Sequence, residues 1–436
     1  MKKLFKYFGY ALLSGVALLS LFMTNLFLMK PYSMDHYLAK ELTMGLLDSP
    51  EFMTYIGVFD PFNAVLKHNQ KLTISTLEDG EENYQDNIKR LSILKKYNSE
   101  KLTDIQKVTQ KIAIFDAEND IHNFENFRYH SYPFNQISGN HLNLVEFMTD
   151  THPVRSYREA SDYIKRVEKF DESLNADLVW LEEQKKLSIF APQYVFDHVI
   201  RQLNELIAYE DSENPLMQVF IRKVNALELN QDKSDQLKNK LSLVIASDVK
   251  PGYKSILKFM EDNYANANEH HGVWSLPNGR DFYAARLRSI TTTDYTAEEI
   301  HKIGLSEVKR ISGRMKEIFI TLGYTVNKPV GEMMNDLNEN PDFLYADTPD
   351  RKEIVVADYN QMVKEAEEAV KPFFERFPVS PVEVRAVPEY SEKTAAGGYY
   401  QAPALDGSRP GVFYANLYDI KQTPTFGMRT LTFHEA

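Results

Sequence analysis

The end of the sequence carries a pair of residues whose types could do hydrolytic chemistry. The chain finishes Thr430–Ala436, with His434 directly followed by Glu435. A His-Glu pair on a helix is the first half of a zincin site, in which the imidazole binds Zn²⁺ and the carboxylate takes a proton from the metal-bound water. We therefore predict His434 as a metal ligand and Glu435 as the general base. An isolated His-Glu dipeptide is weak support in a chain of 436 residues, because such pairs are common by chance.

Two aromatic segments before this pair have the pattern of a β-hairpin. Gly398–Gln401 and Gly411–Leu417 flank the turn sequence Asp406–Ser408. Aromatic-rich runs on either side of a turn that contains glycine are typical of paired antiparallel strands. Strand-like sequence is scarce elsewhere, so we expect a small sheet near the C-terminus.

Three residues of this region are candidates for substrate binding. Tyr399 and Tyr400 would lie on an edge strand that pairs with an extended peptide by β-augmentation, or they would simply pack within an ordinary hairpin. The guanidinium of Arg409 could fix a substrate carboxylate, or it could stabilise the turn. The residue types alone leave both alternatives open for each residue.

Two further clusters could hold metal ions, but their spacing argues against it. His270 and His271 are adjacent, and neighbouring residues of a helix cannot both face one ion, so a solvated turn is favoured. Asp79, Glu81, Glu82 and Asp86 surround Gly80 without the alternating oxygen ligands of a Ca²⁺ loop. We interpret this acidic cluster as a solvated charge run.

The rest of the chain has helical patterning. Ser156–Glu159 and Thr296–Glu299 both read as capping boxes ahead of amphipathic runs, and Pro192 opens a third candidate helix. We predict a mainly α fold: a large helical array, a small hairpin or sheet near the C-terminus, and a zincin-like active-site helix. Lys250–Gly252 suggests a boundary between an N-terminal helical domain, 31–248, and the proximal part of a catalytic domain, 249–436.

Composition excludes several classes of function. The chain has 50 basic and 62 acidic residues, a formal net charge of −12, which disfavours binding to nucleic-acid phosphates. It has no cysteine, which removes disulfides, thiolate metal sites, cysteine nucleophiles and lipid attachment through a cysteine thiol. Any metal must therefore be held by His, Asp or Glu side chains.

The N-terminal residues predict attachment to a membrane. Tyr7–Met29 contains no charge, and at ~1.5 Å per residue a helix of this length reaches ~34 Å, enough to cross a bilayer. Lysines precede this run, which leaves the N-terminus in the cytoplasm and the body periplasmic or extracellular. Its length and its lack of a small-x-small cleavage site favour a signal anchor at residues 1–30. The alternative is a signal peptide that is cleaved, giving a secreted protein.

Several segments together resemble a known family. They are Ser49–Gly57, Tyr132–Gln136, Trp274–Gly279, Thr291–Gly304, Gly397–Tyr400, Asp406–Tyr418 and Thr430–Ala436. They resemble the DUF885 family of bacterial proteins, which is related to helical zinc metallopeptidases and has the signature HEAxPGHH. The resemblance covers nearly all of the chain after the apolar run.

The resemblance implies a function and a site. His434 matches the first zinc ligand of the family and Glu435 its general base, which implies one zinc ion and a peptide substrate. The Pro-Gly-His-His half of the signature and the remaining ligands would lie beyond Ala436, so we expect either a fragment of a longer product, which we favour, or a truncated protein that holds zinc poorly. The leading hypothesis is a membrane-anchored, extracytoplasmic zinc peptidase, and the alternative is a non-catalytic, membrane-anchored helical binding protein that retains the fold.

Overall fold

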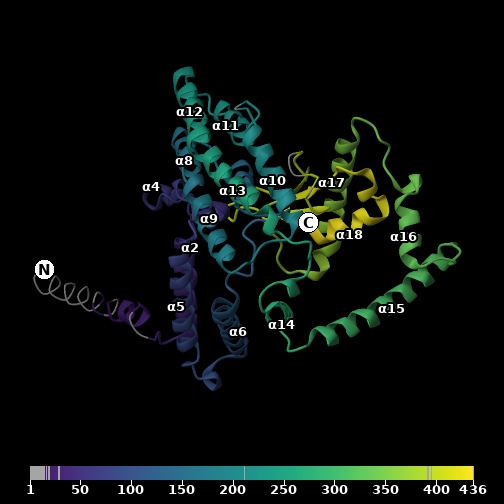
Figure 1. Ribbon diagram of the computed structural model, residues 1–436, viewed down its shortest axis with the longest axis horizontal. Helices are drawn as coiled ribbons and strands as arrows, with labels where there is room; N and C mark the ends of the chain where they lie inside the picture. Colours follow the sequence, from purple (N-terminus) through teal and green to yellow (C-terminus); the bar gives the residue numbers. More distant parts are fainter. Residues whose placement is uncertain are drawn as a thin grey trace, which may run out of the picture. The chain divides into compact units, whose positions relative to one another are not determined.

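A computed structural model describes residues 15, 17, 20–27, 30–210, 212–389, 392–393 and 395–435 (Figure 1). The chain forms two compact units. The first unit comprises Met1–Met53, Lys67–Asn135 and Asn140–Thr293, and the second comprises Thr54–Leu66, Gln136–Gly139 and Asp294–Ala436.

The first unit is built from helices. Its α-helices are α2 (Met34–Leu47), α3 (Pro50–Ile56, which runs into the second unit), α5 (Leu77–Leu94), α6 (Asp104–Phe127), α7 (Asn140–Glu146), α8 (Tyr157–Val167), α9 (Phe170–Lys186), α10 (Gln193–Ala208), α11 (Pro215–Asn225), α12 (Gln231–Val244), α13 (Lys250–Asn263) and α14 (Gly279–Thr291). Its short helices are η2 (His68–Gln70), η3 (Ser99–Lys101), η4 (Phe147–Thr151), η5 (Ile245–Val249), η6 (Tyr264–Asn266) and η7 (Val273–Ser275). The mainly α fold predicted from the sequence is confirmed.

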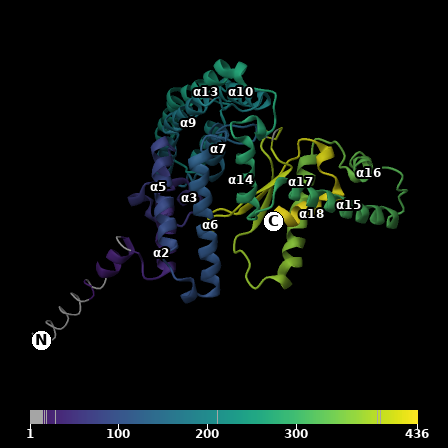
Figure 2. The same cartoon turned by 60° about the horizontal axis from the view of Figure 1, so that its bottom comes forward.

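The largest core of the protein lies in this unit. Helix α13 packs against both α9 and α10, and Figure 2 shows the three side by side. Val199, Leu203 and Ile256 are fully buried there, as the helical spacing of Val199 and Leu203 on α10 predicts. The expected domain boundary at residue 249 does not coincide with the division between the units. Helix α13 follows that point, yet its apolar face completes the core of the first unit, which continues to Thr293.

One capping box is complete and the other is half formed. On α15 (Ala297–Thr321), the backbone N–H of Thr296 donates to the Glu299 carboxylate at 2.8 Å, and the N–H of Glu299 donates to the Thr296 hydroxyl at 3.2 Å. On α8, the Ser156 hydroxyl accepts from the N–H of Glu159, but the Glu159 carboxylate accepts from Arg155 instead of from the cap. Arg155, one residue before the cap, donates its backbone N–H to this carboxylate. The capping-box pattern alone does not predict this competition.

The second unit combines helices with a small sheet. Its elements are η1 (Asp60–Phe62), α4 (Asn63–Leu66), α15, α16 (Val330–Asn338), η8 (Pro341–Phe343), α17 (Arg351–Val370), η9 (Lys371–Phe373), β1 (Val382–Ala386), β2 (Gly398–Gln401), β3 (Gly411–Ala415), η10 (Ile420–Gln422) and α18 (Thr425–Glu435). The strand order is β1-β3-β2. Strands β2 and β3 form the predicted antiparallel hairpin, with Tyr399 opposite Tyr414, and β1 adds a parallel strand on the other side of β3.

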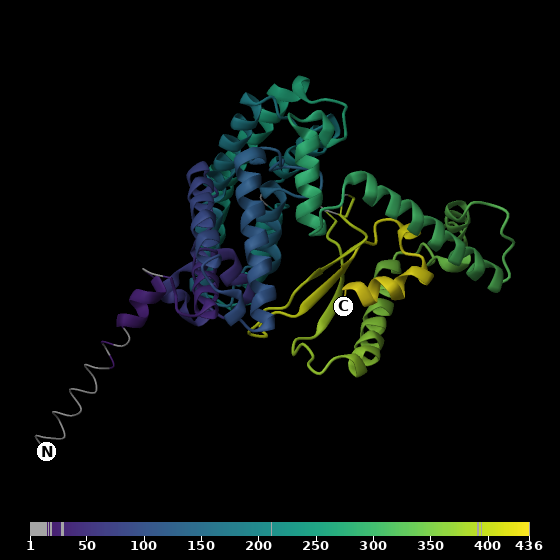
Figure 3. The same cartoon turned by 90° about the horizontal axis from the view of Figure 1, so that it is seen from below.

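Helices α17 and α18 cover one face of this sheet, as Figure 3 shows for the strands (yellow), α17 (yellow-green) and α18 (yellow). Phe413 of β3 is fully buried and meets the ring of Tyr359 on α17 edge to face, with centroids 5.0 Å apart. The opposite face of the sheet buries Val387, Val412 and Tyr414 in a separate cluster. All five residues of β3 are buried because it is the central strand and both its faces are covered.

Replacing Phe413 by alanine should destabilise the second unit by about 3–5 kcal/mol, because it removes a fully buried ring and leaves a cavity. Hydrogen exchange of peptides from α17 and β3 is the measurement to use, since both tryptophans, Trp180 and Trp274, lie in the first unit. Phe373→Ala is the control, because Phe373 is 80% exposed. Unchanged protection in Phe413→Ala would contradict this account of the core.

Much of the N-terminal apolar run lies outside the described residues, so the structure does not test whether it is an anchor. Residues 20–27 are helical. In the part of the chain that the structure describes, no helix is both long and apolar enough to cross a membrane.

Candidate functional site

Helix α18 presents the predicted His-Glu pair at its C-terminal end. Met428 and Thr432, one turn apart, are buried, and the helix lies against α17 and β2. The Thr432 hydroxyl donates to the Met428 carbonyl at 2.9 Å. The burial of Met428 and Thr432 sets the rotation of α18 about its axis. In this orientation His434 is exposed and Glu435 is half-buried.

A glycine brings α18 close to strand β2. A Cβ atom on Gly398 would lie 3.4 Å from Cδ2 of Leu431 and 3.0 Å from the ring of Phe413, so no larger residue fits without a shift. His434 and Glu435 follow Leu431 by three and four residues, the spacing that places residues on one side of a helix. The pair therefore lies one turn beyond the point where α18 touches β2.

Strand β2 is at an edge of the sheet. The N–H of Asn416 donates to the carbonyl of Gly397 at 3.0 Å, so residues 397 and 416 form a hydrogen-bonded pair. Such pairs alternate along antiparallel strands, which directs the backbone groups of Gly398 and Tyr400 away from β3, toward the outer edge. No other strand pairs with that edge within the described ranges.

The two tyrosines predicted for substrate binding lie on opposite faces of β2. Tyr399 stacks on Tyr414, with ring centroids 4.9 Å apart, on the face away from α17 and α18. The hydroxyl of Tyr400 lies 2.3 Å from the place where a Cβ of Gly411 would be, on the other face. Burial raises the pKa of Tyr400, and Tyr55 adds to the shift while Arg409 opposes it. One substrate side chain therefore cannot contact both rings, whereas successive residues of a paired peptide could.

Arg409 makes contacts that stabilise the turn region. Its guanidinium donates to the carbonyl of Ala402 at 3.0 Å and to the carbonyl of Tyr55 at 2.8 Å, and it lies 4.7 Å from the centroid of the Tyr55 ring. These bonds tie the β2–β3 connection to residues 54–66. They match the turn-stabilising alternative, and the binding of a substrate carboxylate by Arg409 stays a prediction.

The other two candidate clusters contain no metal site in the described residues. His270 and His271 are exposed, and their rings lie against Trp274 and Tyr194, at centroid distances of 4.9 and 5.1 Å. The acidic cluster lies on exposed positions of α5. Asp79 caps that helix, and Asp86 pairs with Lys89 at 2.8 Å, as expected for a solvated charge run.

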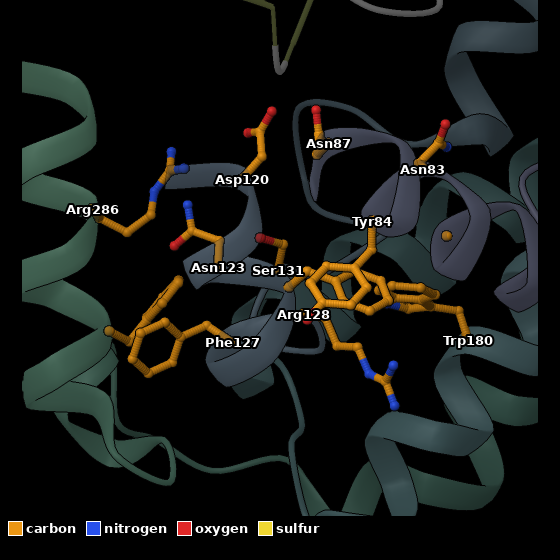
Figure 4. Close-up of a pocket in the computed structure, with 13 residues that line it drawn as sticks. Asn83, Tyr84, Asn87, Asp120, Asn123, Phe127, Arg128, Ser131, Trp180 and Arg286 are labelled. Carbon is orange, nitrogen blue, oxygen red and sulfur yellow. The ribbon is translucent and has the colours of Figure 1, made fainter. Parts of the chain in front are cut away.

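A cavity of about 320 Å³ in the first unit was not predicted from the sequence. Side chains from four helices converge on it, among them Asn83 and Tyr84 of α5, Asn123 of α6, Trp180 of α9 and Arg286 of α14 (Figure 4). Its wall is aromatic, since Tyr84 stacks on Phe124 with centroids 4.7 Å apart. The one available signal was the helical spacing of its lining residues on α6, which include Asp120, Asn123, Phe124 and Phe127.

A larger groove of about 1020 Å³ adjoins this cavity and contains the half-buried carboxylate of Asp177. Burial raises the pKa of Asp177 to about 6, although a hydrogen bond from the Asn140 amide, 2.7 Å long, partly offsets the shift. An aspartate in the unfolded chain titrates near 3.9. The folded protein therefore binds this proton more tightly, so stability should fall as the pH rises from about 4 to 6.

Asp177→Asn should consequently stabilise the first unit at pH 7, by on the order of 3 kcal/mol, and have little effect at pH 4. Asparagine stays neutral at both pH values and can still accept the bond from Asn140. Urea unfolding followed by tryptophan fluorescence measures the effect, with Asp232→Asn on the exposed face of α12 as the control. An equal effect of Asp177→Asn at both pH values would refute the assignment.

A family profile matches nearly the whole described body of the chain. The profile of DUF885, described as bacterial protein of unknown function, matches residues 50–436. Comparison with curated proteins gives no significant match.

Two solved structures are similar to this chain. One, from Colwellia psychrerythraea and described as a "putative lipoprotein", is 27% identical with a TM-score of 0.76, and the match covers 89% of this chain and 70% of that one. Another, from Shewanella oneidensis and described as a "putative lipoprotein of unknown function", is 13% identical with a TM-score of 0.58, over 93% of this chain and 70% of that one. The second likeness concerns the fold alone.

Proposed function

Because the chain belongs to the DUF885 family, we propose that it is a zinc-dependent peptidase that works outside the cytoplasm while attached to a membrane. In this proposal an extended peptide pairs with strand β2, His434 is one zinc ligand, and Glu435 is the general base. The substrate-binding roles of Tyr399, Tyr400 and Arg409 belong to the same proposal.

The observation that carries the proposal is the open edge of β2 beside α18. An extended peptide that adds to this edge would use the outward backbone groups of Gly398 and Tyr400. At ~3.3 Å per residue, β2 spans only ~10 Å, so the bound peptide would pass close to the end of α18. A carboxylate and an imidazole beside a bound peptide bond are the groups that hydrolysis requires.

The donors within the described residues do not complete a zinc site. A catalytic zinc ion takes three protein ligands, whereas α18 offers one imidazole and one neighbouring carboxylate. Nowhere in the described part of the chain do three His, Cys, Asp or Glu side chains gather closely enough to hold a metal. We therefore assign only His434 to the metal and derive no catalytic step through it.

Attachment to a membrane is proposed from two observations. The structural relative from Colwellia psychrerythraea is described as a "putative lipoprotein", and the apolar run Tyr7–Met29 has the length of a bilayer span. This chain has no cysteine to carry a lipid, so the apolar run would be its anchor. Retention of the protein in the membrane pellet after carbonate washing tests this, and release of the intact chain would contradict it.

Hydrolysis of an internally quenched peptide library tests the activity. We expect cleavage that a chelator abolishes and added Zn²⁺ restores, with the protein expressed from its natural gene. Cleavage that survives removal of every metal would contradict the zinc assignment.

The second candidate is a non-catalytic, membrane-anchored helical binding protein that retains the fold, in which the open edge of β2 would take a peptide without any metal. In that case peptides would bind with the same affinity in the presence and absence of chelator, and no product would appear.

A further inference from the structure

The groove of about 1020 Å³ lies entirely within the first unit and is separate from α18. It runs into the aromatic cavity of Figure 4, because Gly80, Asn83, Ser131 and Trp180 line both. What distinguishes this groove from an ordinary surface depression is the backbone along one of its sides.

That side is formed by Leu72–Ser75, an extended segment that belongs to no sheet. Its side chains alternate as in a strand: Leu72 and Ile74 are half-buried, while Thr73 and Ser75 are exposed. The N–H groups of Leu72 and Ile74 have no hydrogen-bond partner in the residues that the structure describes. The segment is therefore a lone strand with one unpaired edge.

Contacts on the opposite edge hold the segment extended. The N–H and the hydroxyl of Thr73 both donate to the Glu51 carboxylate at 2.6 Å, and Nε of Arg166 donates to the carbonyl of Lys71 at 2.6 Å. Residues 71 and 73 point their backbone groups to one side of a strand, and residues 72 and 74 point theirs to the other. The protein thus occupies one edge with its own side chains and leaves the edge of Leu72 and Ile74 available.

Charge decides which ligands suit the groove. Its lining contains six carboxylates and two lysines; the carboxylates are Asp48, Asp79, Glu82, Asp86, Glu172 and Asp177. One of the lysines, Lys169, is already paired with Glu172 at 2.7 Å. An acidic groove attracts cationic ligands and repels anionic ones.

We propose that the first unit binds an extended peptide rich in basic residues, whose main chain pairs with Leu72 and Ile74 by β-augmentation. Alternate side chains of the peptide lie over the acidic groove, and the aromatic cavity accommodates one larger side chain. This binding site does not depend on His434 or Glu435. It would hold a polypeptide on the first unit whether or not the second unit cleaves it.

Fluorescence anisotropy with labelled peptides tests the proposal on the full chain in non-ionic detergent. The probe is a peptide of about twelve alternating lysine and threonine residues, long enough at ~3.3 Å per residue to cover the segment. Two analogues serve as controls: one with glutamate in place of lysine, and one with esters in place of its central amides, which removes N–H donors and keeps the shape. Each analogue should bind at least roughly tenfold more weakly, a loss of about 1.4 kcal/mol.

Matched variants of the protein separate backbone pairing from charge. Ile74→Pro removes the unpaired N–H and should weaken the lysine peptide roughly tenfold, whereas Ile74→Val keeps the N–H and should bind within about twofold. Asp48→Asn with Glu82→Gln should weaken binding more at low salt than at high salt. Glu78→Gln with Glu100→Gln makes the same charge change at exposed residues that do not line the groove, and should leave the affinity unchanged.

The proposal is wrong if the ester analogue binds as tightly as the amide peptide, a result that needs no altered protein and so cannot come from misfolding. Equal affinity for the lysine and glutamate peptides would overturn the charge preference. Equal affinity of Ile74→Pro and Ile74→Val, both folded by circular dichroism, would overturn the assignment of the paired edge. If Glu435→Gln abolished hydrolysis but left this binding intact, the two sites would be independent, as proposed.

Discussion

Glutamine in place of Glu435 is expected to slow peptide hydrolysis by roughly 10²–10⁴-fold and to leave the zinc content unchanged. The amide preserves the shape of the side chain but cannot accept a proton from the attacking water. Glu435 is half-buried at the end of α18, and the helix is held from its other side by Met428 and Thr432, so the substitution should not disturb the fold. The measurements are the cleavage rate of a quenched peptide and the metal content after dialysis.

His434→Ala is the companion variant, because it should lose both metal and activity. Thr430→Ala, at an exposed position of the same helix, should lose neither. Full activity of Glu435→Gln with zinc bound would refute the assigned mechanism even if the protein were a metalloenzyme. If His434→Ala and Glu435→Gln were both active without metal, the assignment of zinc and of both residues would be wrong.

Elements whose signals are local could be predicted from the sequence. The capping box at Thr296 begins α15, and the aromatic runs around Asp406–Ser408 form β2 and β3. The pairing of strand β1 could not be predicted, because its five residues have no adjacent turn that marks a hairpin. It pairs in parallel with β3 across a long intervening segment, and no local pattern encodes such pairing.

The candidate sites likewise contain features that local sequence predicts and features that depend on contacts between distant residues. The placement of His434 and Glu435 on one helix could be predicted from residue type and order, whereas their roles as metal ligand and general base stay a prediction. The contact of Arg409 with the carbonyl of Tyr55 joins residues 354 positions apart, which no motif around Arg409 reveals. The groove is likewise a product of packing, since its lining comes from residues between Leu47 and Trp180 that meet only in the folded unit.

A large loss of stability is expected from substitution of Arg166, a fully buried cation on α8. Its guanidinium donates to the carbonyls of Lys71 and His68 and, at 2.9 Å, to Nδ1 of His152. Burial, together with the nearby charges of Arg166 and Lys223, lowers the pKa of His152 well below its usual value. The imidazole therefore stays neutral and accepts the hydrogen bond.

Arg166→Met should destabilise the first unit by about 3–5 kcal/mol, because it leaves two carbonyls and an imidazole nitrogen buried without their donor. Arg166→Lys should recover only part of this loss, since one ammonium cannot reproduce the planar fork of donors. Arg158→Met, on the exposed side of the same helix, should change stability by less than about 0.5 kcal/mol. Urea unfolding followed by tryptophan fluorescence distinguishes the three variants.

The same substitution links stability to the proposed peptide groove. Arg166 holds the carbonyl of Lys71, the residue directly before Leu72–Ser75, so its loss should free that segment from its extended conformation. Without urea, at a pH where Arg166→Lys is still folded, the lysine peptide should bind the Arg166→Lys variant more weakly than it binds the Arg158→Met control. If Arg166→Lys were destabilised but bound the peptide with full affinity, the segment would be held by Glu51 alone. If Arg166→Met had the stability of the wild-type protein, the buried cation would not stabilise the unit.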